Sequence, residues 1–482
     1  MSLPSWLQPL PDAAQQRALD RWAIDELGIP GETLMERAGT GLARIVAERV
    51  PDGPIAIVCG KGNNGGDGRV AARVLRDEGR TVTVVEPGDG IDLPDVAGIV
   101  DALLGTGFTG EPREPVVSAI AAINTAGRAG ATVIACDVPS GVDGSTGEVH
   151  GVAVRADATV TFSAGKPGLW IAPGKRHVGA VDVVDIGIPD GDSGVVPATG
   201  LIADTVRTEV PRRDAGSSKF TAGSVLICGG SDGLTGAPAM AALGAARAGA
   251  GYVTVAAFAS VAGALQAKLL EQMVTSLPDS SEAIATALER AGRANAVVVG
   301  PGLGRDERAV ELARAVARGA GVPLVLDADG LGACAGCAGE LVGRPAPTVL
   351  TPHSGELARL LGVSSREIDE RRLYYTREAC RLTGATVVLK GDDTLVASPD
   401  GRLAISPGGA PALATAGSGD VLSGILGAYL AKGLDPFTAA CAAVIVHLRA
   451  GRLAAAEIGP EGVIASDVIA RLPRALAAGQ VD

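Results

Sequence analysis

Amide, carboxylate and hydroxyl side chains gather in three glycine-rich motifs, GKGNNGGDG, DALLGTGFTG and DVPSGVDG, which start at residues 60, 101 and 137. Each motif lies at the end of a short apolar run that predicts a buried β-strand. The carboxyl ends of parallel strands meet at one edge of a sheet, where α/β proteins bind ligands. The oxygen donors that the motifs bring to this edge are Asn63, Asn64, Asp67, Asp101, Asp137 and Ser140.

Hard oxygen donors of this kind suit Mg²⁺, Ca²⁺ or an alkali ion, and the sequence shows no histidine or thiolate cluster for a softer metal. Each residue also has a purely structural interpretation. Asn64 could be a left-handed turn residue, and Asp137 could cap the turn after its strand. We favour a binding site because three separate strand ends carry such side chains.

The first motif also matches the dinucleotide-binding pattern G-x-G-x-x-G at residues 60–65. Glu86 ends the next apolar run, where such folds place an acid on the ribose. Asn63, Asn64 and Asp67 argue against this interpretation, because a pyrophosphate favours an uncharged loop of backbone amides. The pattern alone is therefore weak support for a dehydrogenase.

A further glycine-rich stretch, TAGSGD at residues 415–420, directly precedes a predicted helix over residues 421–432. Free backbone amides at a helix N-terminus form an anion hole for phosphate. Asp420 lies in the first turn, where a carboxylate could take a proton from a hydroxyl that faces the terminal phosphate. The alternative is that Asp420 only caps the helix. No G-x-x-x-x-G-K-[ST] motif is present, since residues 216–219 lack its spacing.

The elements that must position these residues form two α/β segments, which meet near residues 190–216 with a Pro-, Gly- and Asp-rich linker at residues 189–200. In the first segment a helix is predicted over residues 12–49. Val- and Ile-rich runs that alternate with helical stretches then indicate a parallel sheet covered on both faces. These strands are predicted at residues 54–60, 81–87, 98–105, 132–139, 158–165 and 180–189.

The second segment repeats this alternation with different loops, so we interpret the chain as a fusion of two domains and not as a duplication. Its strands are predicted at residues 224–231, 251–257, 295–304, 323–330, 347–356 and 385–394. A hairpin with Asp400 and Gly401 in its turn follows. Polar or glycine-rich motifs at the strand ends occupy residues 229–238, 300–306, 326–331, 351–356 and 388–394.

Composition argues against several classes of protein. The chain has 482 residues and a formal net charge of −12, which disfavours a nucleic-acid partner because phosphate contacts need a basic surface. Hydrophobic residues make up 47% of the chain and aromatic residues only 2%, so aliphatic side chains must fill the cores. No apolar run is long enough to cross a membrane and no signal-peptide pattern is present, so we expect a cytosolic protein. The isolated pair Cys334 and Cys337 is weak support for zinc or redox chemistry.

The three N-terminal motifs, in order over about residues 10–205, closely resemble the NAD(P)H-hydrate epimerase family. The resemblance implies a Rossmann-like three-layer α/β/α domain and a potassium ion bound by Asn64, Asp101 and Ser140. It makes Asp137 the candidate acid/base for epimerisation at C6 of the nicotinamide ring. The substrate contacts that it implies are Asn63, Asn64, Gly65, Gly66, Asp67, Gly105, Thr106, Gly107, Phe108, Thr109, Gly110, Glu111 and Asp137.

Over about residues 206–480, the motifs resemble the ribokinase-like superfamily and, within it, the ADP-dependent NAD(P)H-hydrate dehydratases. The resemblance implies Mg²⁺ with ADP as co-substrate, and Asp420 as the base that deprotonates the hydroxyl of the hydrate. The nucleotide contacts that it implies are Lys390, Gly391, Asp392, Asp393, Thr394 and Gly419, and the hydrate contacts are Ala237, Gly304, His353 and Asp420. The family usually carries His-Lys-Gly at the start of this domain, where this chain has Ser-Lys-Phe at residues 218–220.

Together the resemblances imply a bifunctional metabolite-repair enzyme, an isomerase and a lyase. Residues 1–205 would interconvert the R and S forms of NADHX and NADPHX. Residues 206–482 would dehydrate the S form to NAD(P)H while ADP is converted to AMP and phosphate. We also expect a homo-oligomer. The alternatives are a vitamin-precursor kinase fused to a dinucleotide-binding module, which would release a stable phosphorylated product, and a dinucleotide sensor without epimerase turnover.

Overall fold

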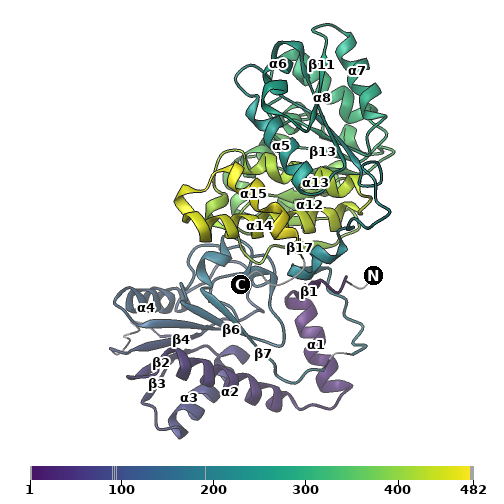
Figure 1. Ribbon diagram of the computed structural model, residues 1–482. Helices are drawn as coiled ribbons and strands as arrows, with labels where there is room; N and C mark the ends of the chain where they lie inside the picture. The colour runs from purple at the N-terminus through teal and green to yellow at the C-terminus, as the bar shows by residue number, and fades with distance from the viewer. Residues whose placement is uncertain (1–2, 89–90, 92, 94, 190, 478–482) are drawn as a thin grey trace. The chain divides into compact units, whose positions relative to one another are not determined.

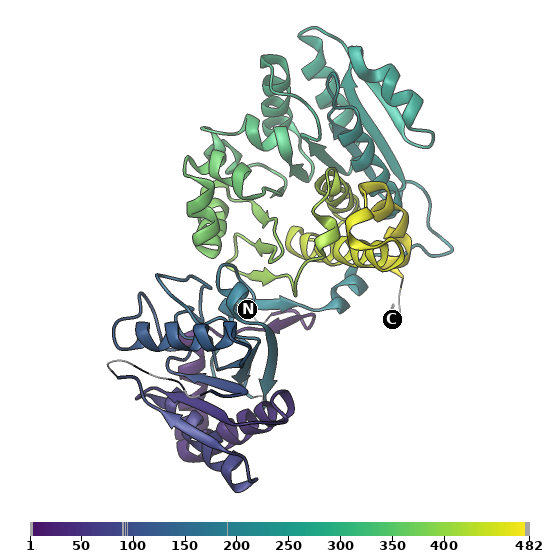
Figure 2. The same ribbon diagram turned by 90° about the vertical axis from the view of Figure 1, so that its left-hand side faces the viewer.

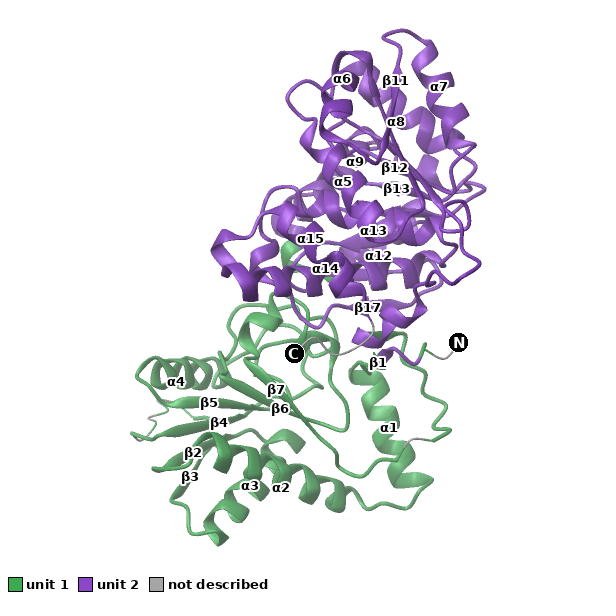
Figure 3. Ribbon diagram, in the orientation of Figure 1, with its two compact units in different colours: residues 1–4, 8–200, 369–373 green, residues 5–7, 201–368, 374–482 purple. Residues whose placement is uncertain are grey.

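The computed structural model describes residues 3–477 apart from residues 89, 90, 92, 94 and 190. It divides into two compact units, shown in green and purple in Figure 3. Unit 1 comprises residues 1–4, 8–200 and 369–373, and unit 2 comprises residues 5–7, 201–368 and 374–482. Each unit is built around a largely parallel β-sheet.

The sheet of unit 1 has the strand order β3-β2-β4-β5-β6-β7, and every neighbouring pair is parallel. Its strands are β2 (Ile55–Cys59), β3 (Val82–Val85), β4 (Gly98–Ala102), β5 (Thr132–Cys136), β6 (Ala158–Phe162) and β7 (Ala180–Val184). They confirm the predicted strands, which were two to five residues too long. After β2 the chain forms β3 on one side of β2 and then crosses over to form β4 on the other side, which creates a switch point between β2 and β4. Ligands of doubly wound sheets bind at such a point.

Alternate side chains of the strands bury two separate cores in unit 1, because successive residues of a strand point to opposite faces. On β2, Ile55, Ile57 and Cys59 join the core under α2 and α3, whereas Ala56 and Val58 join the core under α4. Figure 1 shows α2 and α3 on one side of this sheet and α4 on the other, which confirms the three-layer α/β/α fold. The helices are α1 (Ala13–Asp25), α2 (Gly31–Arg49), α3 (Asn63–Asp77) and α4 (Val116–Arg128).

The single helix predicted over residues 12–49 is wrong, since the chain forms the two helices α1 and α2 there. Asp12 caps α1 through hydrogen bonds from the backbone N–H groups of its first turn. Gly28 adopts a left-handed φ of 67° between the helices. Pro30 then precedes α2, and a residue before proline disfavours the helical region. The break allows α1 to lie against the cavity described below.

The larger sheet has the order β1-β8-β17-β16-β15-β14-β13-β12-β9-β10-β11. Its strands are β1 (Leu7–Pro9), β8 (Thr199–Ile202), β9 (Ser224–Cys228), β10 (Tyr252–Phe258), β11 (Met273–Leu277), β12 (Ala296–Val299), β13 (Leu324–Leu326), β14 (Thr348–Leu350), β15 (Thr386–Leu389), β16 (Leu395–Ala397) and β17 (Leu403–Ile405). The sequence analysis missed β1, β8 and β11. β8 begins inside the predicted linker, β1 is short and ends in proline, and β11 is an edge strand whose side chains are largely exposed or half-buried.

Strands β9 to β15 are parallel, and β15, β16 and β17 are joined in antiparallel fashion. The predicted hairpin is present, with Gly401 at a φ of 95° in its turn. The chain again changes direction at its first central strand, so the switch point of this sheet lies between β9 and β12. Helices cover both faces of the sheet (Figures 1 and 2).

The helices of the second half are α5 (Gly236–Arg247), α6 (Ala259–Lys268), α7 (Glu282–Ala291), α8 (Glu307–Gly319), α9 (Ala328–Ala333), α10 (Ser354–Leu361), α11 (Ser365–Glu370), α12 (Arg372–Thr383), α13 (Ser418–Ala431), α14 (Pro436–Ile458) and α15 (Ala465–Leu476). Short 3-10 helices occupy Pro167–Leu169, Gly174–His177, Asp204–Glu209, Ala338–Leu341, Pro411–Leu413 and Pro460–Gly462. α14 is long and apolar enough to cross a membrane, but 78% of its apolar window is buried within the protein. It packs against α13 and α15, which accounts for its hydrophobicity.

Candidate active sites

Unit 1 has a cavity of about 930 Å³ at the carboxyl ends of its central strands. The predicted contacts that line it are Asn63, Asn64, Asp67, Gly105, Thr106, Gly107, Phe108 and Asp137. The predicted contacts outside the lining are Gly65, Gly66, Thr109, Gly110 and Glu111. Gly65 has a backbone role, since a Cβ there would lie 1.9 Å from the carbonyl oxygen of Gly60. α1, which no motif pointed to, supplies a further wall through Gln16, Arg17 and Asp20.

Asp137 is held in this cavity by side chains from two other segments. It directly follows β5 with a φ of 68°, a conformation that is uncommon outside glycine. Its Oδ2 accepts hydrogen bonds from the backbone N–H of Thr106 at 2.8 Å and from the Thr106 hydroxyl at 2.5 Å. Its Oδ1 lies 3.0 Å from Nζ of Lys166 and accepts a hydrogen bond from the Thr161 hydroxyl at 3.2 Å. The carboxylate is therefore fixed in one orientation.

Lys166 is a functional candidate that the sequence analysis missed. Its side chain is 2% exposed, and its ammonium group donates to the Thr161 hydroxyl and to the Phe162 carbonyl, both at 2.8 Å. A buried lysine is rare unless it is paired, and this one is paired with Asp137. The available signal was its place in FSAGKPG, just after a predicted strand at the edge where the other motifs gather.

Two carboxyl groups of the cavity have pKa values shifted in opposite directions. Burial by itself raises the pKa of Asp137, but the charge of Lys166 and the hydrogen bonds from Thr106 outweigh it, so this pKa lies below its ordinary value. Burial, followed by the negative charges of Asp137 and Asp20, raises the pKa of Asp67 to about 8. Near neutral pH the cavity holds an ionised Asp137 and a protonated Asp67. Such a division suits one group to accept and the other to donate a proton.

The predicted potassium ligands lie around one loop, residues 103–105. Asp101 is fully buried, and its carboxylate accepts hydrogen bonds from Ser140 through the backbone N–H at 2.8 Å and the hydroxyl at 2.6 Å. Burial raises the pKa of Asp101 to about 6. Ser140 also accepts a hydrogen bond from the Leu104 N–H, and Asn64 lies against Gly105, where a Cβ would be 3.2 Å from Asn64 Oδ1.

The amide of Asn64 is the unusual feature of this group. Its Oδ1 and Nδ2 atoms are both buried and have no hydrogen-bond partner among the described residues, although buried polar atoms are nearly always satisfied. An unpartnered amide oxygen near a buried carboxylate and hydroxyl fits a hard cation. The donor set is therefore compatible with the predicted ion.

In unit 2, the predicted anion hole is the start of α13. Gly417 precedes the helix at a φ of 87°, which favours glycine, and a Cβ there would lie 2.4 Å from the end of the Met240 side chain, which would have to move. Asp420, in the first turn, accepts no hydrogen bond from the described residues, which leaves the capping interpretation without its bond. Burial, followed by the charge of Asp327, raises the pKa of Asp420 to about 7.

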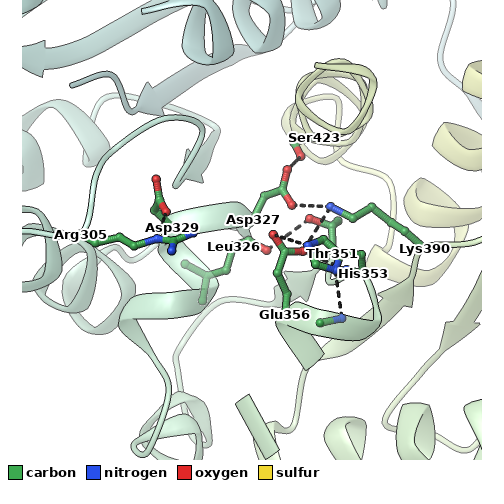
Figure 4. A network of polar contacts seen from close by, with 10 residues as sticks. Arg305, Leu326, Asp327, Asp329, Thr351, His353, Glu356, Lys390 and Ser423 are labelled. Carbon is green, nitrogen blue, oxygen red and sulfur yellow. Dashed lines mark hydrogen bonds and ion pairs between the residues drawn. The ribbon is translucent and has the colours of Figure 1, made fainter. Parts of the chain in front are cut away.

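Lys390 follows β15 and stands beside this first turn, since a Cβ on Gly419 would lie 3.5 Å from its Nζ. Its Nζ lies 2.9 Å from Oδ1 of Asp327 and 3.5 Å from Oε2 of Glu356 (Figure 4). Burial lowers the pKa of Lys390, but the charges of Asp327 and Glu356 outweigh it and raise the pKa above its ordinary value. The lysine thus places a positive charge beside the backbone amides of the predicted anion hole. Asp327 and Ser423, which complete this network, had no assigned role in the sequence analysis.

The remaining predicted residues occupy strand ends and helix starts of the same sheet. Ala237 lies in the first turn of α5, and Gly304 follows β12 with a φ of 91°. His353 caps α10 by accepting a hydrogen bond at Nδ1 from the Gly355 N–H at 3.0 Å. Its side chain is 56% exposed and its Nε2 lies 3.5 Å from Oε1 of Glu356. His353 therefore has both a capping role and an exposed face.

Residues 391–394 form the loop between β15 and β16. The Thr394 hydroxyl closes the loop by donating to the Gly391 carbonyl at 2.7 Å. Asp392 accepts a hydrogen bond from the Gly409 N–H at 2.8 Å, and Asp393 is buried. The described residues contain no group of three or more His, Cys, Asp or Glu side chains arranged for a metal.

Comparison with known proteins identifies the family. A sequence-family model described as NAD(P)H-hydrate dehydratase matches residues 225–474, and one described as YjeF-related protein N-terminus matches residues 31–92 and 86–168. The bifunctional NAD(P)H-hydrate repair enzyme Nnr of Salinibacter ruber is 38% identical, with 97% of this chain and 96% of that protein covered. The enzyme of the same name from Escherichia coli is 34% identical, with 94% and 91% covered.

Solved structures match the second half. The ADP/ATP-dependent NAD(P)H-hydrate dehydratase from Bacillus subtilis, co-crystallised with ATP and Mg²⁺, is 32% identical with a TM-score of 0.51, covering 57% of this chain and 96% of that one. A ribokinase-like superfamily protein from Enterococcus faecalis is 25% identical with a TM-score of 0.51, covering 58% and 95%. These matches confirm the ribokinase-like α/β fold. With nearly full-length similarity to enzymes of both activities, the chain belongs to the family of bifunctional NAD(P)H-hydrate repair enzymes.

Proposed function

We propose that this chain repairs hydrated NADH and NADPH, with the epimerase in residues 1–205 and the ADP-dependent dehydratase in residues 206–482. The full-length similarity to bifunctional repair enzymes supports both activities. The single observation that carries the assignment is the placement of one carboxylate in each unit, Asp137 in the cavity of unit 1 and Asp420 in the first turn of α13 in unit 2. We further propose a cytosolic homo-oligomer that binds neither nucleic acid nor membrane.

The epimerase step exchanges the hydroxyl at C6 of the nicotinamide ring between the two faces. The ionised Asp137, oriented by Lys166 and Thr106, accepts a proton from the substrate. Asp67 is protonated near neutral pH and donates a proton to the substrate in the same epimerisation. Asn64, Asp101 and Ser140 would hold a potassium ion, which would supply positive charge near the substrate.

The dehydratase step turns a poor leaving group into a good one. Asp420 takes the proton of the C6 hydroxyl, whose oxygen then attacks the β-phosphorus of ADP and AMP leaves. The C–O bond of the ring then breaks, and phosphate leaves with the bonding electrons. Loss of a proton from the neighbouring ring carbon restores the double bond of the dihydronicotinamide. Lys390 and the amides of Gly417–Gly419 hold the phosphate oxygens, and a Mg²⁺ ion bound with the nucleotide would neutralise part of their charge.

The decisive experiment incubates the chain with a mixed R/S hydrate of NADH, with and without ADP, and follows the recovery of NADH absorbance. The proposal expects complete recovery with ADP, equimolar AMP and phosphate, and no recovery without a nucleotide. Recovery of only the S fraction would contradict the epimerase assignment. A stable phosphorylated product without NADH would contradict the dehydratase and favour the kinase alternative.

A further inference from the structure

We propose that Asp327 is a positioning residue of the dehydratase. Asp327 fixes the position of Lys390, the proposed nucleotide contact, relative to the first turn of α13. The inference rests on the proposed function of this site. In that proposal Asp327 contacts neither the hydrate nor the nucleotide. Asp327 acts through Lys390 and Ser423.

Both oxygens of Asp327 are occupied by side chains from different elements. Oδ1 accepts a hydrogen bond from Nζ of Lys390 at 2.9 Å, and Oδ2 accepts a short hydrogen bond from the hydroxyl of Ser423. Figure 4 shows the carboxylate of Asp327 between these two partners. Asp327 is 1% exposed and Ser423 is fully buried. A buried carboxylate with both oxygens engaged is fixed in place and cannot rotate without breaking a charged contact.

The backbone around Asp327 is built to hold it there. Its N–H donates to the Val299 carbonyl at 3.1 Å, which ties it to the neighbouring strand. A Cβ on Gly300 would lie 1.8 Å from the Asp327 carbonyl oxygen, so the two segments are in closest approach. Ala328, the next residue, has a left-handed φ of 46°. Strain of this kind in a residue other than glycine persists only where the surroundings determine the conformation.

The contacts of Ser423 connect Asp327 to the anion hole. The Ser423 hydroxyl also contacts the Gly419 carbonyl at 3.0 Å, one turn earlier on α13. Gly419 in turn lies beside Nζ of Lys390. Asp327, Lys390, Gly419 and Ser423 therefore form a closed ring of contacts around the first turn of the helix. Asp420 lies inside the stretch of α13 that this ring fixes.

The negative charge of Asp327 also reaches Asp420, where it is the largest cause after burial of the raised pKa. Besides Asp327, the charged groups that act on Asp420 are Asp329, Glu356 and Lys390, and the titratable His447 of α14 lies against the Ser418 backbone in the same turn. Asp329 and Glu356 act in the same direction as Asp327, whereas Lys390 acts against them. On α5 the one charged side chain, Arg247, is exposed in the last turn. Removal of the Asp327 charge therefore lowers the pKa of Asp420.

The test compares the full chain carrying Asp327→Asn with wild type, using purified S hydrate, saturating Mg²⁺ and a range of ADP concentrations and pH values. We expect KM for ADP to rise and kcat to fall, because Lys390 and α13 are both released. We also expect the acid limb of the kcat profile to move to lower pH by about one unit, the size of shift that a nearby like charge produces. Epimerase activity of the same variant serves as an internal control for folding.

Ser423→Ala is the second, milder variant, which leaves the pair between Asp327 and Lys390 in place. It is expected to lower kcat with KM for ADP unchanged and the acid limb unmoved. Asp435→Ala, which removes the N-cap of α14, is the control for lost stability alone and leaves both kinetic constants unchanged at temperatures where the chain is folded. If Asp327→Asn behaves as this control does, with a lower melting temperature and an unmoved acid limb, Asp327 is only structural and the inference is overturned. If wild type fails to recover NADH at all, the proposed function fails instead.

Discussion

The surroundings of Asp420, and not its residue type, give this proposed base its pKa. It lies among amides of a helix N-terminus, yet burial and nearby carboxylates raise its pKa to about 7. A base of that pKa is ionised in about half of the molecules at neutral pH and takes a proton with useful driving force. The absence of a capping bond leaves the carboxylate available for substrate.

Asp420→Asn tests the role directly. The change keeps the shape of the side chain and removes its basicity, so we expect a folded variant with dehydration slowed by about 100-fold or more. Nucleotide binding and epimerase activity should be retained. Circular dichroism, ADP binding by calorimetry and single-turnover NADH recovery measure the three quantities, and a dehydration rate close to wild type would show that another group is the base.

The same residue predicts the pH dependence of the wild-type dehydratase. Because Asp420 must be deprotonated to act, kcat should be constant well above pH 7 and should fall about tenfold for each unit below it. Measurement of kcat from pH 5 to 9 at saturating ADP checks this. A profile that stays flat through pH 6 would contradict the assignment of the limb to Asp420.

Lys166 and Asp137 form a buried ion pair whose two halves depend on each other. Lys166→Met leaves the Asp137 charge without its main partner, so we expect a loss of about 3–5 kcal/mol in unfolding free energy of unit 1 and loss of epimerase activity. Adding Asp137→Asn to this variant should restore part of the stability and none of the activity, because the orphaned charge is gone. Thermal melting and epimerase assays of the single and double variants decide. Equal stability of Lys166→Met and wild type would contradict the pairing.

Asp67 illustrates a cost in stability at a functional position. Its pKa is about 8 in the folded chain and near 4 when unfolded, so the folded state binds the proton more tightly. Stability of unit 1 should therefore fall as pH rises from about 4 to 8. Asp67→Asn removes this dependence and is expected to melt higher than wild type at pH 8, by more than at pH 4. Melting curves at the two pH values measure it, and identical differences would contradict the raised pKa.

At the scale of elements, both sites are built at the carboxyl ends of parallel strands, and short glycine segments set how closely loops approach. The segment before α13 is the clearest case. Gly417 has a left-handed φ and faces the Met240 side chain, so the anion hole depends on the absence of a Cβ. α3 also begins after a glycine, Gly62, which is extended, and its first two turns carry Asn64 and Asp67.

Gly417→Ala should therefore harm the dehydratase more than the backbone strain alone explains. The matched control is Gly433→Ala, at the other end of α13, where φ is also 87° but no atom lies within 4 Å of the added methyl group. Both variants should lose about 1–2 kcal/mol from the left-handed conformation. Only Gly417→Ala should also lose ADP binding, measured by calorimetry. Equal ADP affinity in the two variants would contradict the anion hole.

At the scale of the whole molecule, the two units carry separate sheets and separate sites, so their activities should respond independently. Asn64→Leu replaces the unpartnered amide by an apolar group of similar size, and we expect it to abolish activation of the epimerase by potassium. Dehydration of purified S hydrate by the same variant should be unchanged. Epimerase rates in potassium and lithium salts, beside dehydration rates, provide the measurement. Potassium activation that survives in the variant would contradict the proposed ion site.

The sequence by itself determined most of the fold and the chemistry-bearing loops. Apolar runs of strand length predicted every strand of the sheet in unit 1, because buried parallel strands are continuous in hydrophobicity. β1 and β11 were not predicted, because a short strand and an edge strand lack a continuous hydrophobic run. The break at Gly28 and Pro30 was missed because the amphipathic pattern continues on both sides of it.

The tertiary structure alone decided the partners and protonation states. Lys166 joins Asp137 from the loop that follows β6, and Ser423 joins Asp327 over a separation of 96 residues, so no local pattern could pair them. The opposite pKa shifts of Asp137 and Asp67 arise from burial and from charges on other loops. Residue types name the groups that can move protons, but only the fold sets their surroundings, and surroundings set the free energy of the charge.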